Sequence, residues 1–392
     1  MHQTRIEGNT EFITNSEDKI SKDMPIFYNP IMQLNRDISL VVMSAFFKDS
    51  KHEHPSVALP MEASGIRAAR ILNELVRTNL LIPKKILIND LSQDAINYAK
   101  ENIELNIKEI PEDILPEIQF SALDASIFLR MQHPLDYIDL DPFGTPNPFL
   151  DSAVQKLARG GLIAVTATDT SALAGTYPKA TAKKYWSTPT RTWLMHDAGM
   201  RILIRKVQLI GAQYDKGLYP VLSMSTDHYY RIFFRCAQSH TDVHTILAQH
   251  QYLQVCNSCH EFFTSKESFE SCKKCSQITA FAGPLWIGIM HDTKLVDASI
   301  EIAKHFDEKK HRAMHKLLLA IKEECKINTV GHYDLHILAG LHKMQPPKRD
   351  DVIAILGNYA CKSQYDGHFI KTELSSEKIV EAMRKCSETN QL

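Results

Sequence analysis

The chain has 392 residues, of which 44% are hydrophobic and 23% charged, and its formal net charge is −1. This composition is ordinary for a globular protein, and the length favours two domains. No apolar run approaches the ~18–20 residues needed to cross a bilayer, and the N-terminus lacks the apolar core of a secretion signal. Eight cysteines, four of them close together, are typical of a reducing compartment rather than a disulfide scaffold, so we expect a cytoplasmic protein with no membrane partner.

Charge is unevenly distributed along the chain. Residues 101–150 carry 2 Lys or Arg against 10 Asp or Glu, whereas residues 151–250 carry 12 against 6. Such segregation can build a basic face on a neutral protein, and an ordinary solvated surface is the alternative. Charge alone therefore does not indicate a nucleic-acid partner.

Between residues 55 and 240, short apolar runs alternate with helix-like patterns. The expected strands are residues 56–60, 85–90, a run ending near Phe120, 136–140, 162–168 and 229–235. The first expected helix begins after Gly65. The others cover residues 93–106, 149–159 and 200–213. This alternation predicts an α/β fold with a mostly parallel, doubly wound sheet.

Three acids follow predicted strands. Asp90, Asp124 and Asp141 stand at strand ends or in the loops just after them. Ligands of doubly wound sheets bind beyond the carboxyl ends of the strands. We therefore expect the chemistry of the protein to lie along this edge.

The texture of the sequence changes after the polar stretch around residue 240. A cysteine-rich block covers residues 256–275, and the remainder mixes helices with short polar turns. We expect one domain over residues 1–239, built on the sheet with an N-terminal extension, and a smaller C-terminal α+β domain over residues 240–392.

Two C-x-x-C pairs lie in that block. Cys256 and Cys259 form the first pair, and Cys272 and Cys275 form the second after twelve residues. Each pair can hold one face of a tetrahedral ion, so the spacing predicts a closed structural Zn²⁺ site that supports folding rather than catalysis. His260 could replace one ligand, but an ordinary surface histidine is the preferred interpretation.

A glycine turn follows the first predicted strand, in the segment Ala63-Ser64-Gly65-Ile66-Arg67. Glycine lets the backbone approach a ligand, and helix N-terminal amides favour carboxylates or phosphates. Asp90, after the next strand, is placed where a carboxylate binds a ribose diol in nucleotide-binding sheets. Each feature also has an ordinary interpretation as a loop residue.

A series of short motifs supports a family resemblance over nearly the whole chain. The motifs, in chain order, are Glu7-Gly8, Phe27-Tyr28-Asn29-Pro30, Leu34-Asn35-Arg36-Asp37, Ser64-Gly65-Ile66-Arg67, Asn89-Asp90, Asp139-Leu140-Asp141-Pro142-Phe143-Gly144, Leu173-Ala174-Gly175, Tyr177-Pro178-Lys179-Ala180, Ser225-Thr226-Asp227-His228-Tyr229-Tyr230, Gly283-Pro284-Leu285-Trp286 and Tyr333-Asp334-Leu335-His336. In this order they resemble the tRNA (guanine-26, N2)-dimethyltransferase family, which are class I S-adenosylmethionine-dependent methyltransferases with a Rossmann-like sheet.

The resemblance implies a cofactor site and a tRNA partner. S-adenosylmethionine would be lined by Arg36, Arg67, Asp90, Asp124 and Ala125, and the C-terminal zinc domain would contact tRNA. Asp90 would accept from the ribose hydroxyls, Asp124 would reach the adenine amino group, and an arginine could pair with the methionine carboxylate. The chain departs from the pattern at Glu62, an acid displaced from the first strand, and in having fewer glycines in the turn.

The segment Asp141-Pro142-Phe143-Gly144 is interpreted as the catalytic motif. The exocyclic N2 of guanine is a poor nucleophile, so a carboxylate that accepts from N2–H would hold it and stabilise its developing charge. An aromatic ring beside the carboxylate would stack on a base flipped out of its helix. Asp141 and Phe143 are the expected catalytic residues; the alternative is an acid capping a turn, with Phe143 packed in the core.

The basic block interleaves cations with aromatic residues, a pattern that suits RNA. Its members are Lys179, Lys183, Lys184, Arg191, Arg201, Arg205 and Lys206, with Tyr185, Trp186 and Trp193. Two other functions remain open: an amino-methyltransferase acting on another nucleic-acid site, and an inactive relative that only binds RNA. No obligate protein partner is implied.

Overall fold

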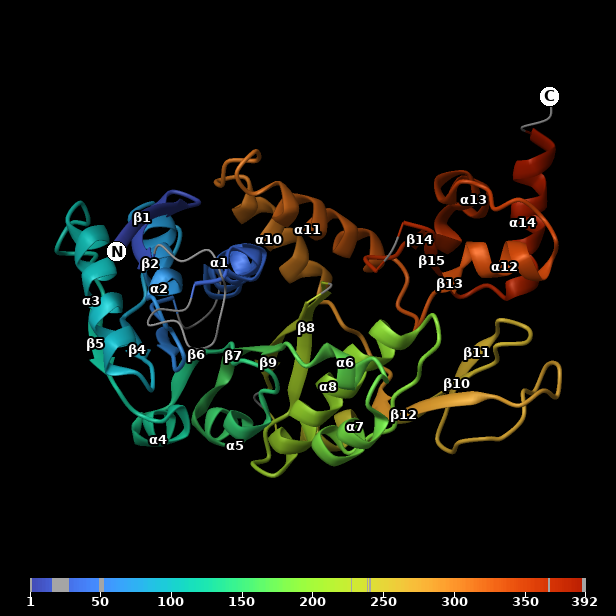
Figure 1. Ribbon diagram of the computed structural model, residues 1–392, viewed down its shortest axis with the longest axis horizontal. Helices are drawn as coiled ribbons and strands as arrows, with labels where there is room; N and C mark the ends of the chain where they lie inside the picture. Colours follow the sequence, from blue (N-terminus) through green and yellow to red (C-terminus); the bar gives the residue numbers. More distant parts are fainter. Residues whose placement is uncertain are drawn as a thin grey trace.

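A seven-stranded sheet forms the centre of the computed structural model, which describes residues 2–15, 28–48, 53–226, 228–237, 239, 241–365 and 367–389 (Figure 1). The motif residues Phe27 and Asp227, and His240 at the expected domain boundary, lie outside the described residues. Within the described part, no helix combines the length and the apolar character needed to span a membrane.

The strand order of the sheet is β5-β4-β3-β6-β7-β9-β8. The strands are β3 (Ser56–Leu59), β4 (Lys85–Asn89), β5 (Glu117–Ser121), β6 (Leu135–Leu140), β7 (Leu157–Ala167), β8 (Leu218–Ser225) and β9 (Tyr230–Cys236). Strands β3 to β7 are parallel, and β9 lies antiparallel between β7 and β8. The predicted doubly wound α/β sheet is confirmed, and the order reverses at β3, where such sheets open a crevice for ligands.

Alternate residues of the strands enter two different hydrophobic cores. On β3, Val57 and Leu59 pack into the core that contains α1 (Gln33–Lys48) and α10 (Thr293–Ala303). Ala58 packs into the core that contains α5 (Asn147–Lys156) and α8 (Met195–Ala212). Because neighbouring side chains of a strand point to opposite faces, both faces of the sheet are buried under helices.

Most of the predicted elements have the expected bounds. Helix α3 (Gln93–Ile107) begins at Ser92, whose hydroxyl accepts from the Ala95 amide at 3.3 Å. The helix expected over residues 149–159 is wrong at its end, because β7 already begins at Leu157. Gly160, at φ 79°, allows the chain to start the strand early, beside an irregular register with β6.

Helices and short segments complete the sheet region. They are the 3₁₀ segment η1 (Pro30–Met32), α2 (Ile66–Arg70), the π-helical η2 (Ile71–Val76), α4 (Ala125–Met131), α6 (Thr170–Leu173), α7 (Pro178–Tyr185) and α9 (Thr241–Leu247). Before the sheet, β1 (His2–Glu7) and β2 (Thr10–Asn15) form an antiparallel hairpin.

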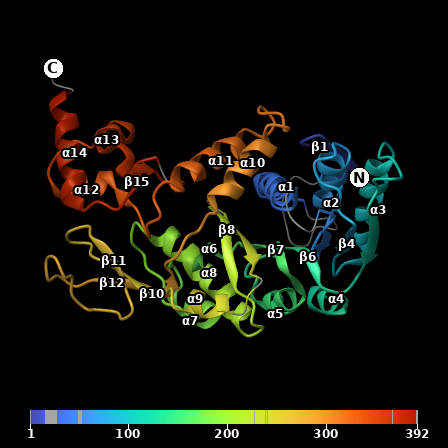
Figure 2. The same ribbon diagram turned by 180° about the vertical axis from the view of Figure 1, so that it is seen from behind.

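The C-terminal part contains two small sheets. The first has the order β11-β10-β12, from β10 (His250–Val255), β11 (Phe262–Ser265) and β12 (Ala280–Trp286). The second has the order β13-β15-β14, from β13 (Tyr333–Asp334), β14 (Ala360–Lys362) and β15 (Phe369–Thr372), with α12 (Leu335–Leu341), α13 (Arg349–Leu356), η3 (Gly357–Tyr359) and α14 (Ser376–Thr389). Both lie at the same end of the molecule (Figure 2).

Two helices after residue 240 return to the large sheet. Helix α10 and α11 (Arg312–Glu324) place Val296, Leu318 and Ile321 in the core that also holds α1. The C-terminal half is therefore anchored on the sheet at one point and extends beyond it at another (Figure 1). The division of the chain at residue 240 stays a prediction.

Candidate active site

The predicted acids lie along one edge of the sheet. In the order of the sheet, Asp124 follows β5 and Asp90 follows β4. The glycine turn follows β3, and Asp141 follows β6. Because these strands are parallel, their carboxyl ends meet at the same edge. The fold thus brings the sequence candidates together where the strand order reverses.

Asp141 is held by an arginine from the turn after β3. The Nη2 of Arg67 donates to Asp141 Oδ2 at 2.5 Å, and also to Asn35 Oδ1 at 3.0 Å. Its Nη1 donates to Ser39 Oγ at 2.8 Å. Arg67 is buried, so these bonds fix its guanidinium, and through it one oxygen of Asp141. The other oxygen of Asp141 accepts no hydrogen bond from the described residues.

A buried ionic network lies beneath this pair. Asp139 accepts two bonds from Arg231, at 2.8 and 2.7 Å, and one from the Tyr137 hydroxyl at 2.7 Å. Arg67 lies 3.3 Å from the same carboxylate. Burial alone would raise the pKa of Asp139, but Arg231 and Arg67 outweigh it and hold that pKa below its ordinary value. Asp139 is therefore ionised at neutral pH and anchors the arginine that positions Asp141.

Tyr229 is a residue of this site to which sequence reasoning gave no role. Its side chain is buried, and its hydroxyl has no hydrogen-bond partner among the described residues. Burial and the charge of Asp141 raise the pKa of Tyr229, so a neutral hydroxyl lies within electrostatic range of the carboxylate. Its place in a quoted motif was the only signal for it.

Phe143 is 51% exposed, which excludes the alternative in which it packs in the core. The turn that carries it is tied to the end of β7: the Gly144 amide donates to Thr168 Oγ1 at 2.6 Å, and the Thr168 amide donates to the Gly144 carbonyl at 2.9 Å. Gly144 has φ 78°, a conformation that favours glycine. A fixed turn thus presents an aromatic ring to solvent beside Asp141.

Asp90 organises the loop between β3 and α2. Its Oδ2 accepts from the Ala63 amide and its Oδ1 from the Ser92 amide, each at 3.0 Å. Each carboxylate oxygen can accept a further bond, so the group still suits a ribose diol. The glycine also has a packing role: at Gly65, with φ 78°, an added Cβ would lie 2.7 Å from Ala99 Cα of α3. It therefore permits close packing of two helices.

The displaced acid Glu62 lies under the same turn. Its Oε1 accepts from the Ala68 amide at 2.8 Å, and burial raises the pKa of Glu62 to about 8. Asp124 caps α4, accepting from the Ser126 and Ile127 amides through Oδ1 alone, at 2.9 and 3.2 Å. Its Oδ2 accepts from no described residue and remains open to a ligand. Ala125 begins α4 and is buried.

Arg36 points toward the N-terminal hairpin. It makes a two-pronged pair with Glu7, with Nε–Oε1 2.7 Å and Nη2–Oε2 2.5 Å, and both side chains are buried. The ion pair is therefore internal rather than at the surface. A cofactor bound to Arg36 would have to share the guanidinium of this arginine with Glu7.

The four cysteines converge as the C-x-x-C spacing predicts. The ligand atoms of Cys256, Cys259, Cys272 and Cys275 all lie within 4.8 Å of one another. Four thiolates at this separation suit a tetrahedral Zn²⁺ with no open position. The cluster lies on loops beside β10 and β11 and is compatible with structural zinc.

The interpretation of His260 as a surface histidine is wrong. Its side chain is fully buried, and its ring lies 3.7 Å from the ring of Trp193. Its Nε2 accepts from the Asp334 amide at 3.2 Å. The first knuckle bends sharply enough, with His260 at φ 60°, to direct this ring inward between the two parts of the chain.

The basic block is only partly a surface. Lys179, Lys183 and Arg191 are exposed, but Arg201 is buried against Asp197 and Lys206 is buried with its Nζ 3.0 Å from the centre of the Trp186 ring. The last two cations therefore belong to internal packing, which sequence spacing could not reveal.

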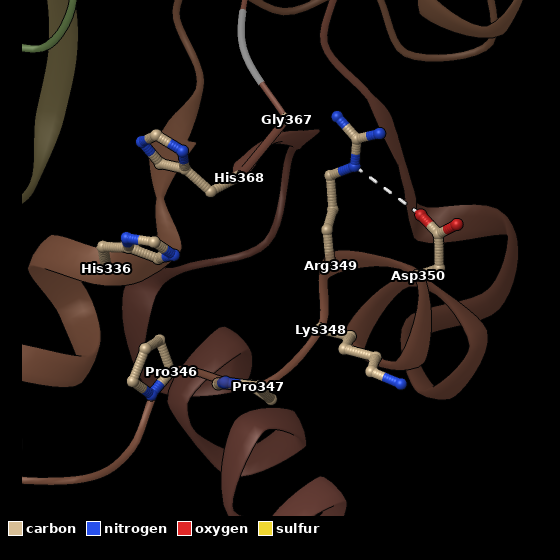
Figure 3. Close-up of a pocket in the computed structure, with 8 residues that line it drawn as sticks. All are labelled: His336, Pro346, Pro347, Lys348, Arg349, Asp350, Gly367 and His368. Atoms are coloured by element: carbon tan, nitrogen blue, oxygen red, sulfur yellow. Dashed lines mark ion pairs between the residues drawn. The ribbon is translucent and has the colours of Figure 1, made fainter.

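A pocket lined by α12, the start of α13 and the segment before β15 lies in the C-terminal part (Figure 3). It has a volume of about 560 Å³ and contains Lys348, Arg349, and the stacked rings of His336 and His368, whose centres are 4.4 Å apart. His336 is the last residue of the motif Tyr333-Asp334-Leu335-His336, so this motif contributes a side chain to a surface pocket.

The sheet order and the acid–aromatic pair at its carboxyl edge define a Rossmann-like methyltransferase, and three comparisons identify the kind. A model of the N2,N2-dimethylguanosine tRNA methyltransferase family matches residues 5–384, and the chain belongs to that family. A tRNA (guanine(26)-N(2)/guanine(27)-N(2))-dimethyltransferase of Aquifex aeolicus is 38% identical over 93% of this chain and 91% of its own length. The tRNA (guanine(26)-N(2))-dimethyltransferase of Methanobrevibacter smithii is 35% identical over 98% and 97%. The structure of Trm1 from Pyrococcus horikoshii with S-adenosyl-L-methionine matches with a TM-score of 0.84 and 27% identity, over 97% of this chain and 99% of that one.

Proposed function

We propose that the protein transfers one or two methyl groups from S-adenosylmethionine to the exocyclic N2 of guanine 26 in tRNA. The observation that carries this proposal is Asp141, fixed by Arg67 at the carboxyl end of β6 beside the exposed ring of Phe143. Membership of a tRNA-methylating family over residues 5–384 supports the choice of substrate. The same proposal places the protein in the cytoplasm, with tRNA as its partner and no need of a membrane or an obligate protein partner.

The catalytic role assigned to Asp141 follows from its two oxygens. Oδ2 is occupied by Arg67, which holds the carboxylate in place, and the other oxygen faces no described donor. That oxygen would accept from N2–H of the flipped guanine, align the nitrogen for attack and stabilise the positive charge that develops on it. When the N–C bond forms and the S–C bond breaks, the nitrogen must lose a proton, which the carboxylate can accept. Phe143 would stack on the same base.

The cofactor would supply an electrophilic methyl group bound to a sulfonium. Asp90 would hold its ribose through lone pairs that its two backbone donors leave open. Asp124 would accept from the adenine amino group through Oδ2, and Ala125 would line the same site. Arg67 and Arg36 are the guanidiniums assigned to the methionine carboxylate, and both would keep their present partners.

One Zn²⁺ would be held by the four cysteines Cys256, Cys259, Cys272 and Cys275. It would contribute to folding of the C-terminal part rather than to methyl transfer. The donor set is complete with four thiolates, so no position is left for a substrate.

Mass spectrometry of nucleosides from tRNA incubated with protein and S-adenosylmethionine tests the proposal. We expect N2-methylated guanosine, and a transcript with adenine at position 26 should lose it. Product that persists in this transcript but disappears when position 27 is replaced would move the target to the second guanine named for the Aquifex relative. Cofactor binding without methylation of any tRNA would favour an inactive RNA-binding relative.

A further inference from the structure

A second cavity lies where the large sheet meets the C-terminal part of the chain. It has a volume of about 440 Å³. The sheet side contributes Trp193, His196 and Ser225, and the C-terminal part contributes Ile337, Tyr365 and Phe369. We call this cavity the junction pocket. None of the residues assigned above to the catalytic or cofactor site lines it.

The junction pocket opens at the same edge of the sheet as the active site. Ser225 ends β8, and Asp141 follows the end of β6. Two strands, β7 and β9, separate β6 from β8, and the pairing pattern makes β6 and β8 run in the same direction. Three strand spacings amount to roughly 14 Å. One base cannot occupy both places, but a neighbouring nucleotide of an opened strand can reach from one to the other.

The lining suits a flat aromatic ligand. Trp193 is backed by His260 and its Nε1 donates to the His332 carbonyl at 3.0 Å, while Phe369 stacks on His332 with ring centres 4.3 Å apart. The rings are thus held from behind, so little side-chain freedom would be lost when a ligand stacks on them. The Ser225 hydroxyl has no hydrogen-bond partner among the described residues and can bond to the edge of a base.

We propose that the junction pocket holds a second unstacked nucleobase of the tRNA, next in the strand to the guanine that Asp141 receives. This inference rests on the proposed function, which supplies the RNA. Turning one base out of a helix also removes the stacking partner of its neighbour. Capture of that neighbour on an aromatic platform stabilises the opened strand, and it accepts any base because every base offers a flat face.

Filling the pocket tests the proposal without touching the active site. Ile337 and Leu341 lie one turn apart on α12 and are 37% and 43% exposed, but only Ile337 lines the pocket. Ile337→Trp should raise the KM for tRNA on the order of tenfold or more, the effect of losing one base–aromatic stack. Leu341→Trp, the matched control, should not. Both variants should keep the wild-type melting temperature and affinity for S-adenosylmethionine.

Abasic tRNA identifies the occupant. Transcripts lacking the base on one or the other side of the target guanine are compared with intact tRNA. The wild type should bind one of them on the order of tenfold more weakly, and Ile337→Trp should no longer distinguish that transcript from intact tRNA, because the two changes remove the same contact. Independent, multiplying losses would overturn the inference.

The two proposals fail in different ways. If the wild type methylates tRNA while Ile337→Trp and Leu341→Trp have the same KM, the junction pocket does not hold a base. If the wild type binds S-adenosylmethionine but methylates no tRNA, the proposed function is wrong and this inference fails with it.

Discussion

The site depends on how one carboxylate is restrained. Asp141 is in contact with Arg67, which lies 74 positions earlier in the chain, and Arg67 is fixed in turn by Asn35, Ser39 and Asp139. Such a chain of buried bonds keeps a reactive group in one geometry before substrate arrives, and positioning is a large part of the barrier in methyl transfer. The same carboxylate on a mobile loop would have to be ordered in every reaction cycle.

Replacing Asp141 by asparagine should separate binding from catalysis. Asparagine keeps the shape and one acceptor oxygen but loses the charge and the capacity to take a proton. We expect Asp141→Asn to bind tRNA and cofactor nearly normally, while its single-turnover rate at saturating tRNA falls about 10²–10³-fold. Asp151→Asn removes a partly exposed carboxylate of α5 that pairs with Arg130, and serves as the control. A near wild-type rate would mean that Asp141 only stabilises its turn.

At the scale of elements, a buried ionic cluster attaches the N-terminal hairpin to the helices. Glu7 on β1 pairs with Arg36 of α1 and with Arg70 of α2 at 3.0 Å, and accepts from the Tyr28 hydroxyl at 2.9 Å. Although burial opposes it, these partners lower the pKa of Glu7 from 4.5 to about 2. The cluster therefore stabilises the fold in full above about pH 4.5 and is lost as the pH falls toward 2.

Glu7→Gln should lower the free energy of unfolding at pH 7 by about 3 kcal/mol, the value of a pKa lowered this far. The difference in free energy of unfolding between variant and wild type should decrease below pH 4.5, because the wild-type carboxyl then takes up a proton. Urea unfolding at several pH values measures both effects. Glu11→Gln, at an exposed position of β2, is the control and should cost little. A gap that stays constant down to pH 2 would contradict the linkage.

The second feature at the scale of elements is the pair of loops, one on each side of β11, that carry the four cysteines; we call them the zinc loops. They direct His260 onto Trp193 and toward the Asp334 amide, and both Trp193 and Asp334 line the junction pocket. Metal binding to the four cysteines would thus support a contact between the sheet and the C-terminal part. The cysteine spacing predicts the site, whereas its connection to Trp193 is visible only in the fold.

Cys272→Ser should remove close to one equivalent of zinc, as metal analysis would show, and should weaken tRNA binding more than binding of S-adenosylmethionine. The reason is that the proposed cofactor site lies at the carboxyl ends of β3 to β6, at the other end of the molecule from β10 and β11 (Figure 1). Cys325→Ser, at a cysteine outside the cluster, should change neither. Unaltered metal content in Cys272→Ser would refute the assignment of the ligand set.

At the scale of the whole molecule, the part of the chain after residue 240 divides into helices that cover the large sheet and small sheets that extend from it. Helices α10 and α11 share a core with α1 on one face of the large sheet, while the small sheets lie beyond its β8 edge (Figure 1). Under the proposed function, tRNA would bind a surface that includes the exposed cations of α7. The net charge of −1 gives no sign of such a surface, because acidic and basic segments cancel in the sum.

Binding of tRNA should weaken with salt, whereas binding of S-adenosylmethionine should barely change, because phosphate contacts release counterions. Reversing the charge of exposed Lys179 and Lys183 together should raise the KM for tRNA and reduce the salt slope by about 2. Reversal of exposed Lys294 and Lys316, on α10 and α11, is the matched control. Equal effects of the two pairs would place the RNA surface elsewhere.

The sequence by itself determined the doubly wound sheet, the cysteine cluster and the acids at the strand ends. These depend on local hydrophobic periodicity, on short spacings and on the common direction of parallel strands. Only the tertiary structure decided which arginine holds Asp141, that Phe143 faces solvent, that Arg201 and Lys206 are internal, and that His260 is buried against Trp193. Each of these depends on contacts between segments far apart in the chain, which no local pattern specifies.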